Sequence, residues 1–144
     1  MSETSTPQKI SFVIPSTPQA QQRHRHTTRG KFTMVYDPSA KAKKTILQQV
    51  RKFAPNPPLN CPLRMDITCY FERPKSHYRT GKFSSELRPN IPLYHTVKPD
   101  RDNIEKIIQD ALNGVFYRDD SLICSGTTQK FYGEPRTEIT ITTL

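Results

Sequence analysis

Residues 103–113 carry a helical repeat of apolar side chains, and the rest of the chain has to fold so that these side chains are buried. Its members are Ile104, Ile107, Ile108, Ala111 and Leu112. They recur at the spacing i, i+3, i+4, i+7 and i+8, which places them on one face of an amphipathic helix. Gly114 follows as a C-terminal stop signal. The pattern predicts a helix of about 11 residues, roughly 16 Å long.

Four other segments have the character of β-strands, because they alternate apolar and polar side chains or are rich in β-branched residues. These are residues 9–14, 65–71, 122–131 and 137–142. Asp37 and Pro38 give the start signal of a first helix that continues to about Phe53. The resulting order predicts an α+β fold, in which two main helices cover one face of a small mixed β-sheet.

The length of 144 residues fits one domain. We expect residues 1–8 to form a disordered tail and residues 9–144 to form a single domain. No run of about 18 apolar residues is present to span a membrane, and the polar N-terminus lacks the apolar core of a secretory signal. The cysteines are widely spaced, which argues against a disulfide framework or a zinc site and favours the cytoplasm. They are Cys61, Cys69 and Cys124.

The charge distribution points to a polyanionic partner. The chain has 22 Lys and Arg against 13 Asp and Glu, a net charge of +9. An excess of this kind is typical of proteins that bind nucleic acid. Two long basic loops, residues 15–31 and 73–97, are the expected contact regions. The DNA-binding residues predicted there are Arg23, Arg25, Arg29, Lys31, Arg73, Lys75, Arg79 and Lys82.

The acidic residues, in contrast, gather around the predicted second helix. Asp100 and Asp102 are one residue apart before it, and Asp119 and Asp120 follow it. In an extended segment the carboxylates of Asp100 and Asp102 would point to the same side. A chain return over the sheet could bring one of the later pair beside them. Gathered carboxylates without a Cys or His set indicate Mg²⁺, with Mn²⁺ as a possible substitute.

Such a metal could polarise a phosphate and generate a hydroxide nucleophile. Lys106 lies one helical turn beyond Asp102 and could stabilise charge on the scissile phosphate. Helix capping offers a simpler account of Asp102, because Glu105 follows three residues later as in a capping box. Capping does not explain Asp100 or the later pair.

These residues carry a recognisable pattern. The segment KPDRDNIEKIIQDALNGVFYRDDSLI resembles the RusA family of Holliday-junction resolvases. It contains D-x-D-N, a lysine four residues after the second Asp, then D-A-L-N and a D-D pair. The resemblance implies that Asp100, Asp102 and Asp120 are metal ligands and that Lys106 is the catalytic lysine. Asp119 corresponds to an acidic position to which the resemblance assigns no definite role.

The resemblance also implies a small, Mg²⁺-dependent, homodimeric endodeoxyribonuclease of a kind commonly encoded by bacteria, phages or prophages. We therefore expect the protein to resolve Holliday junctions in DNA recombination and repair by paired symmetric phosphodiester hydrolysis. A two-fold dimer would place two sites on a two-fold substrate. The expected partners are branched DNA and a second copy of the chain, with no membrane and no small-molecule cofactor.

Two alternatives stay open. The first is a nuclease for other branched DNA, such as flaps, because the acidic motif sets the chemistry while the loops select the substrate. The second is a non-catalytic basic DNA-binding module in which the acidic residues serve only folding.

Overall fold

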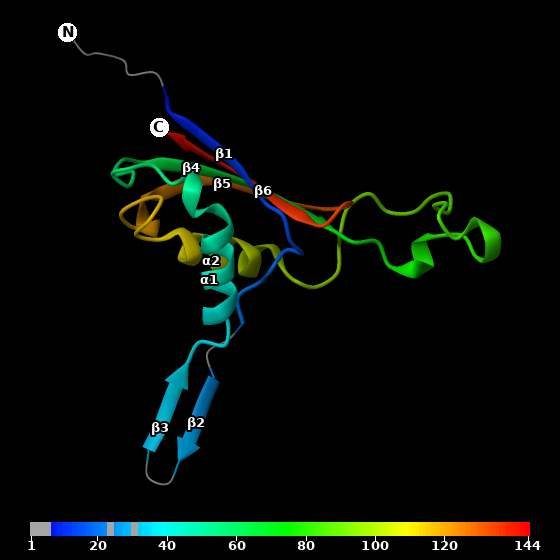
Figure 1. The fold of residues 1–144 in the computed structure, drawn as a ribbon, viewed down its shortest axis with the longest axis horizontal. Coiled ribbons are helices and arrows are strands. Elements are labelled where there is room, and N and C mark those ends of the chain that lie inside the picture. The colour runs from blue at the N-terminus through cyan, green and yellow to red at the C-terminus, as the bar shows by residue number, and fades with distance from the viewer. Residues whose placement is uncertain (1–6, 23–24, 30–31) are drawn as a thin grey trace.

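The chain forms one four-stranded mixed sheet with two helices against one of its faces (Figure 1). A computed structural model describes residues 7–22, 25–29 and 32–144. The sheet has the order β1-β6-β4-β5, in which β4 and β5 are parallel and the other pairs are antiparallel. Its strands are β1 (Lys9–Ile14), β4 (Leu63–Phe71), β5 (Ile123–Tyr132) and β6 (Arg136–Thr143). The helices are α1 (Ala40–Val50) and α2 (Arg101–Leu112). The α+β prediction, with helices on one face of a mixed sheet, is confirmed.

The core lies between the sheet and the helices. All five apolar residues of the predicted α2 stripe are buried. Alternate residues of β4 face them, because every second side chain of a strand points to the same face. Those residues are Leu63, Met65, Ile67, Cys69 and Phe71. The other face of the sheet carries ion pairs between Arg64 and Asp66 and between Arg136 and Glu138, together with the aromatic side chains of Tyr70 and Phe131.

The predicted loop over residues 15–31 is partly wrong. β2 (Arg25–Arg29) lies within these residues, and β3 (Phe32–Tyr36) follows them. The two strands form a separate antiparallel hairpin that projects away from the main sheet (Figure 1). The β-branched and aromatic residues of these segments favour strands. The prediction gave more weight to the basic charge and the turn residues of this region.

The first helix starts later than predicted. α1 begins at Ala40 with Ser39 as its N-cap, two residues beyond the predicted cap. Asp37 Oδ1 instead accepts a 2.9 Å hydrogen bond from the backbone N of Ser39 in the turn before the helix. The predicted end is close to the observed one, because a 3-10 turn, Arg51–Phe53, follows α1 directly.

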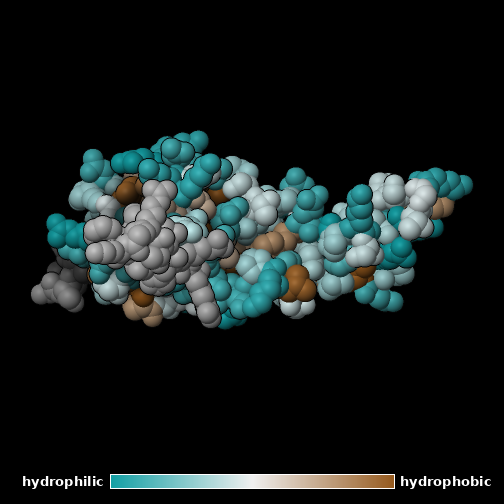
Figure 2. All heavy atoms as spheres, turned by 90° about the horizontal axis from the view of Figure 1, so that it is seen from below, coloured by the Kyte–Doolittle hydropathy of each residue, from teal (hydrophilic) through white to brown (hydrophobic). Residues whose placement is uncertain are grey.

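Residues 72–93 form an arm that extends away from the sheet (Figure 1). As predicted it has no long helix or strand, but two short 3-10 turns, Lys75–His77 and Gly81–Phe83, lie within it. Backbone hydrogen bonds join its two sides, from Arg79 N to Glu86 O at 2.8 Å and from Arg88 N to His77 O at 2.9 Å. Its surface is mainly hydrophilic, with a few isolated hydrophobic residues (Figure 2).

Two remaining expectations concern the ends of the chain and the membrane. Residues 1–6 of the predicted tail lie outside the described residues, whereas Gln8 pairs with Thr143 through a 2.9 Å backbone hydrogen bond. Within the described part of the chain, none of the helices is long and apolar enough to cross a membrane.

Candidate active site

The start of α2 carries the first two carboxylates of the acidic motif. Asp100 has an extended backbone (φ −74°, ψ 150°) and is the N-cap residue, and Asp102 is the second residue of the helix. The alternative account of Asp102, in which it caps the helix and Glu105 completes a capping box, is therefore wrong. Asp102 Oδ1 accepts a 2.9 Å hydrogen bond from Asn103 N, while Glu105 Oε2 accepts a 3.1 Å hydrogen bond from Thr128 Oγ1.

The expected extended geometry of the pair is also wrong, because only Asp100 precedes the helix. The two carboxylates nevertheless share the first turn of α2, and both residues are exposed. The positive end of a helix dipole favours anionic side chains at this place.

Asp100 forms an ion pair with Lys98. Lys98 Nζ donates hydrogen bonds to both carboxylate oxygens, at 3.0 and 2.9 Å. This hydrogen bonding, together with the positive charges of Lys98 and Lys130, holds the pKa of Asp100 below its ordinary value of 3.8. Asp100 is therefore ionised at neutral pH and can act as an anionic oxygen ligand.

Lys130, on β5, fixes the segment that leads into Asp100. Its Nζ donates hydrogen bonds to the carbonyl oxygens of Val97 at 2.7 Å and of Pro99 at 2.6 Å. Partial burial lowers the pKa of Lys130, and the nearby charge of Asp100 opposes that shift. The ammonium thus ties the entry of α2 to the neighbouring strand of the sheet.

The later acidic residues lie near the C-terminal end of α2. Asp120 begins a 3-10 turn, Asp120–Leu122, and lies close enough to Asp110 and Asp119 to interact with both. Burial raises the pKa of Asp120, and the negative charges of Asp119 and Asp110 raise it further. This end of the helix therefore concentrates negative charge.

Lys43, on α1, partly neutralises that charge. Its Nζ lies 3.3 Å from Asp110 Oδ2 and 2.6 Å from Asp37 Oδ2. The hydrogen bond from Lys43, with the one from Ser39 N, lowers the pKa of Asp37 to about 2. Lys43 therefore connects the turn before α1 to the acidic end of α2.

The acidic motif is thus divided between the two ends of one helix. Asp110 lies eight residues after Asp102, which corresponds to about 12 Å along the helix axis. Asp120, beside Asp110, is consequently not brought to Asp100 and Asp102 within one chain. Among the residues that the structure describes, no group of three or more His, Cys, Asp or Glu side chains is placed to hold a metal ion. The joint ligand set of Asp100, Asp102 and Asp120, with Asp119 as a further candidate, stays a prediction.

The donor chemistry at the start of α2 nevertheless suits a hard divalent cation. Mg²⁺ is commonly bound through one or two carboxylates and takes its remaining ligands from water and substrate phosphate. Asp100 and Asp102 supply two such carboxylates, and Asp100 already attracts the Lys98 ammonium. Lys106 is exposed one turn beyond Asp102.

The predicted DNA-binding residues of the second loop lie on the arm. Lys75 and Lys82 are exposed there. Arg79 pairs with Glu86 at 2.6 Å, and its guanidinium lies 4.1 Å from the centroid of the Phe83 ring.

Arg73 has a different position, at the base of the arm. It donates a 2.8 Å hydrogen bond to the carbonyl oxygen of Pro92. In the first predicted contact region, Arg23 and Lys31 lie outside the described residues. Arg25 and Arg29 belong to β2, for which the backbone alone is described.

Sequence reasoning did not single out Lys43 or Lys130. Each acts through partners far away in the chain, Asp110 for Lys43 and Pro99 for Lys130. Lys43 lies on the side of the first helix that carries the buried Ile46 and Val50, and Lys130 lies in a polar stretch of a strand. Neither pattern distinguishes the lysine from the residues around it.

Fold and site together define a small α+β protein whose basic chain presents exposed carboxylates at the start of a helix. The sequence matches the family model described as "Endodeoxyribonuclease RusA" over residues 15–142, and the chain belongs to this family. It is also 33% identical over 135 residues to a protein of Bacillus subtilis (strain 168) described as "Uncharacterized protein YqaN". That alignment covers 92% of this chain and 94% of the relative.

Proposed function

We propose that this member of the RusA family is a metal-dependent endodeoxyribonuclease that resolves Holliday junctions by paired symmetric hydrolysis. The observation that carries the proposal is the first turn of α2. It presents Asp100 and Asp102 to solvent, with the exposed Lys106 one turn further on. Residues 9–144 would act as a single domain.

In this proposal Asp100 and Asp102 hold Mg²⁺, for which Mn²⁺ is a possible substitute. When bound, the ion would polarise the scissile phosphate and promote ionisation of a water molecule. Lys106 donates to a phosphate oxygen and stabilises the negative charge that grows on it during attack. Lys130 keeps residues 97–99 in place, so that Asp100 does not have to be ordered when the substrate arrives.

A homodimer is part of the proposal for two reasons. Two symmetric cuts in opposed strands need two sites, and a two-fold dimer matches a two-fold substrate. The second reason is the division of the acidic motif along α2. Since Asp120 does not reach Asp100 and Asp102 within one chain, a second copy offers a way to bring the three carboxylates together.

A panel of labelled substrates tests the proposal and separates it from its alternatives. The panel contains a mobile four-way junction, a flap and a linear duplex of matched sequence, each incubated with Mg²⁺ or with a chelator. We expect paired nicks in the junction with Mg²⁺ and none with the chelator. Preferred cutting of the flap would identify a nuclease for other branched DNA. Binding without cutting under every divalent metal would indicate a DNA-binding module.

A further inference from the structure

A row of aromatic side chains crosses the uncovered face of the sheet near the candidate site. Phe131 on β5 stacks on Tyr70 of β4 with ring centroids 5.8 Å apart, and Tyr94 packs on Phe131 at 5.0 Å. The guanidinium of Arg136 lies 3.7 Å from the centroid of Tyr70. The row follows from the strand register, because Tyr70 lies opposite both Arg136 and Phe131, and Tyr94 forms a bridge with Phe131.

The row ends at an exposed ring. Tyr94 is 56% exposed, although it packs on Phe131. Backbone hydrogen bonds hold the residues on either side of it, from Tyr132 N to Leu93 O and from His95 N to Lys130 O, both at 3.0 Å. The buried His95 ring also stacks on a neighbouring aromatic side chain with centroids 3.8 Å apart. Tyr94 is therefore a fixed side chain with an accessible surface.

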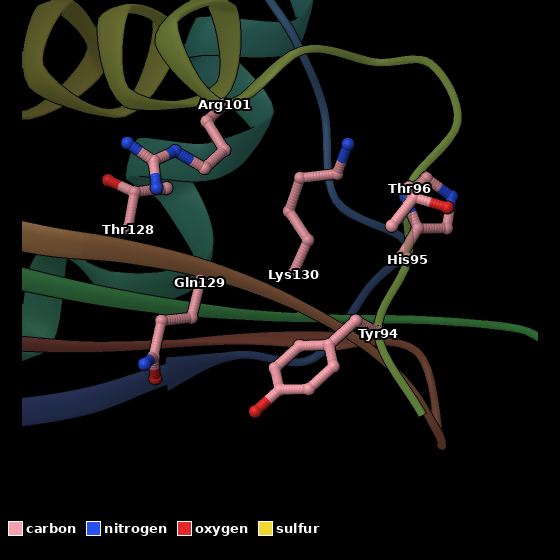
Figure 3. Close-up of a pocket in the computed structure, with 7 residues that line it drawn as sticks. All are labelled: Tyr94, His95, Thr96, Arg101, Thr128, Gln129 and Lys130. Carbon is pink, nitrogen blue, oxygen red and sulfur yellow. The ribbon is translucent and has the colours of Figure 1, made fainter. Parts of the chain in front are cut away.

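Tyr94 borders a hollow of about 420 Å³, which we call the Tyr94 hollow. Its volume lies in the range of small-ligand sites. Tyr94 and Gln129 lie on one side of β5, and Arg101 and Lys130 lie toward the start of α2 (Figure 3). Arg101 directly follows Asp100, so the hollow adjoins the candidate metal ligands.

The two cations of the hollow have different tasks. Lys130 already donates to two backbone carbonyl oxygens, so it contributes positive charge while its position is fixed. Arg101 is exposed, and its planar guanidinium is suited to a phosphate group. The hollow thus combines an accessible aromatic ring with an arginine, a combination that recognises a base and a phosphate.

We propose that the Tyr94 hollow is a nucleotide subsite, in which an unpaired base of the bound DNA stacks on Tyr94 and the adjoining phosphate pairs with Arg101. The inference rests on the proposed nuclease function. Branched DNA suits such a subsite, because extruding a base is easiest where pairing is already disturbed. Stacking on a tyrosine ring accepts every base, so the subsite would position the strand without selecting a sequence.

Junctions that carry 2-aminopurine at successive positions around the branch provide the probe. Fluorescence and affinity are measured in chelator, where hydrolysis is not expected, for the wild type and two matched variants. Tyr94→Phe keeps the ring, whereas Tyr94→Leu keeps apolar bulk for the contact with Phe131 and removes the ring. Leu93→Ala is the control, because Leu93 is the neighbouring residue and is similarly exposed, at 57%.

We expect quenching at one or more positions with the wild type, Tyr94→Phe and Leu93→Ala. Tyr94→Leu should lose the quenching and about 5- to 150-fold in affinity. The subsite would be overturned if Tyr94→Leu showed the same fluorescence and affinity as the wild type, or if the wild type quenched the fluorescence at none of the positions.

A parallel Mg²⁺ cleavage assay separates the two proposals. Tyr94-dependent quenching without cutting would contradict the nuclease and support the subsite, whereas cutting with an unaffected Tyr94→Leu would overturn the subsite alone.

Discussion

Lys130 donates a 2.6 Å hydrogen bond to the carbonyl oxygen of Pro99, the residue immediately before Asp100. A second hydrogen bond from the same ammonium, to the carbonyl oxygen of Val97, measures 2.7 Å. Lys130 of the sheet therefore fixes the backbone that leads into the candidate metal ligand Asp100. Lys130 donates to the backbone beside Asp100 and not to the Asp100 carboxylate, so it acts on the site by positioning.

Replacing Lys130 by Met should loosen the entry of α2. The variant loses hydrogen bonds from a charged donor, so the free energy of unfolding should fall by roughly 1.5–3 kcal/mol in urea denaturation. Junction cleavage should fall more than junction affinity, because the disturbed residue is a candidate metal ligand. Lys98→Met is the matched control, since Lys98 is 85% exposed and its loss should leave stability nearly unchanged. Equal stability of both variants would contradict the positioning role.

Replacing Asp120 by Asn should stabilise the protein at neutral pH. The raised pKa of Asp120 means that the folded chain holds this proton more tightly than the unfolded chain. Ionisation of Asp120 therefore lowers wild-type stability as pH rises from the ordinary value of 3.8 through the raised folded value. We expect a melting temperature a few degrees higher for the variant at pH 7, and no such advantage near pH 3. A constant difference at both pH values would rule out ionisation as the cause.

Lys43 should have the opposite effect on the same end of α2. Lys43→Met leaves Asp110 and Asp37 without their cation, so the free energy of unfolding should fall by about 1 kcal/mol at pH 7. The double variant with Asp110→Asn should recover part of this loss, because one of the two carboxylates is then neutral. A double-mutant cycle by urea denaturation measures the coupling. Strict additivity would show that Lys43 does not stabilise the fold through Asp110.

DNA affinity should depend strongly on salt. A protein with 6–10 phosphate contacts loses roughly 10³–10⁵ in affinity between 50 and 200 mM salt. Lys75→Ala and Lys82→Ala, both on the exposed arm, should each reduce the slope of log affinity against log salt by about 1. The comparison is Lys9→Ala, in β1, where no change in slope is expected. An unchanged slope in both arm variants would exclude the arm as a phosphate contact.

Local sequence patterns were sufficient to predict the main helix and strand elements of the fold. The α2 stripe and the alternation in β4 predicted which residues are buried, because each pattern repeats with the geometry of its own element. The β2–β3 hairpin was missed, since charge and turn residues dominated the interpretation of that segment. The cap of α2 was misplaced by two residues because Asp100 and Asp102 are both favourable N-cap residues.

The site was predictable only in its residue types. The clustering of aspartates and the position of Lys106 are visible along the chain, but the contacts of Lys130 and Lys43 depend on how α1, α2 and β5 pack. The same packing separates Asp120 from Asp100. Asp100 and Asp120 are separated in the sequence by only one helix and a turn, but this does not bring them together in space.

The central claim is that the carboxylates at the start of α2 support metal-dependent DNA hydrolysis. Its most direct test is single-turnover cleavage of a mobile four-way junction by the wild type, Asp100→Asn and Asp102→Asn, with Mg²⁺ and with a chelator. We expect paired symmetric nicks from the wild type with Mg²⁺ alone, and no nicks from either variant although both still bind the junction. Wild-type cutting by both variants, or cutting in chelator, would contradict the account.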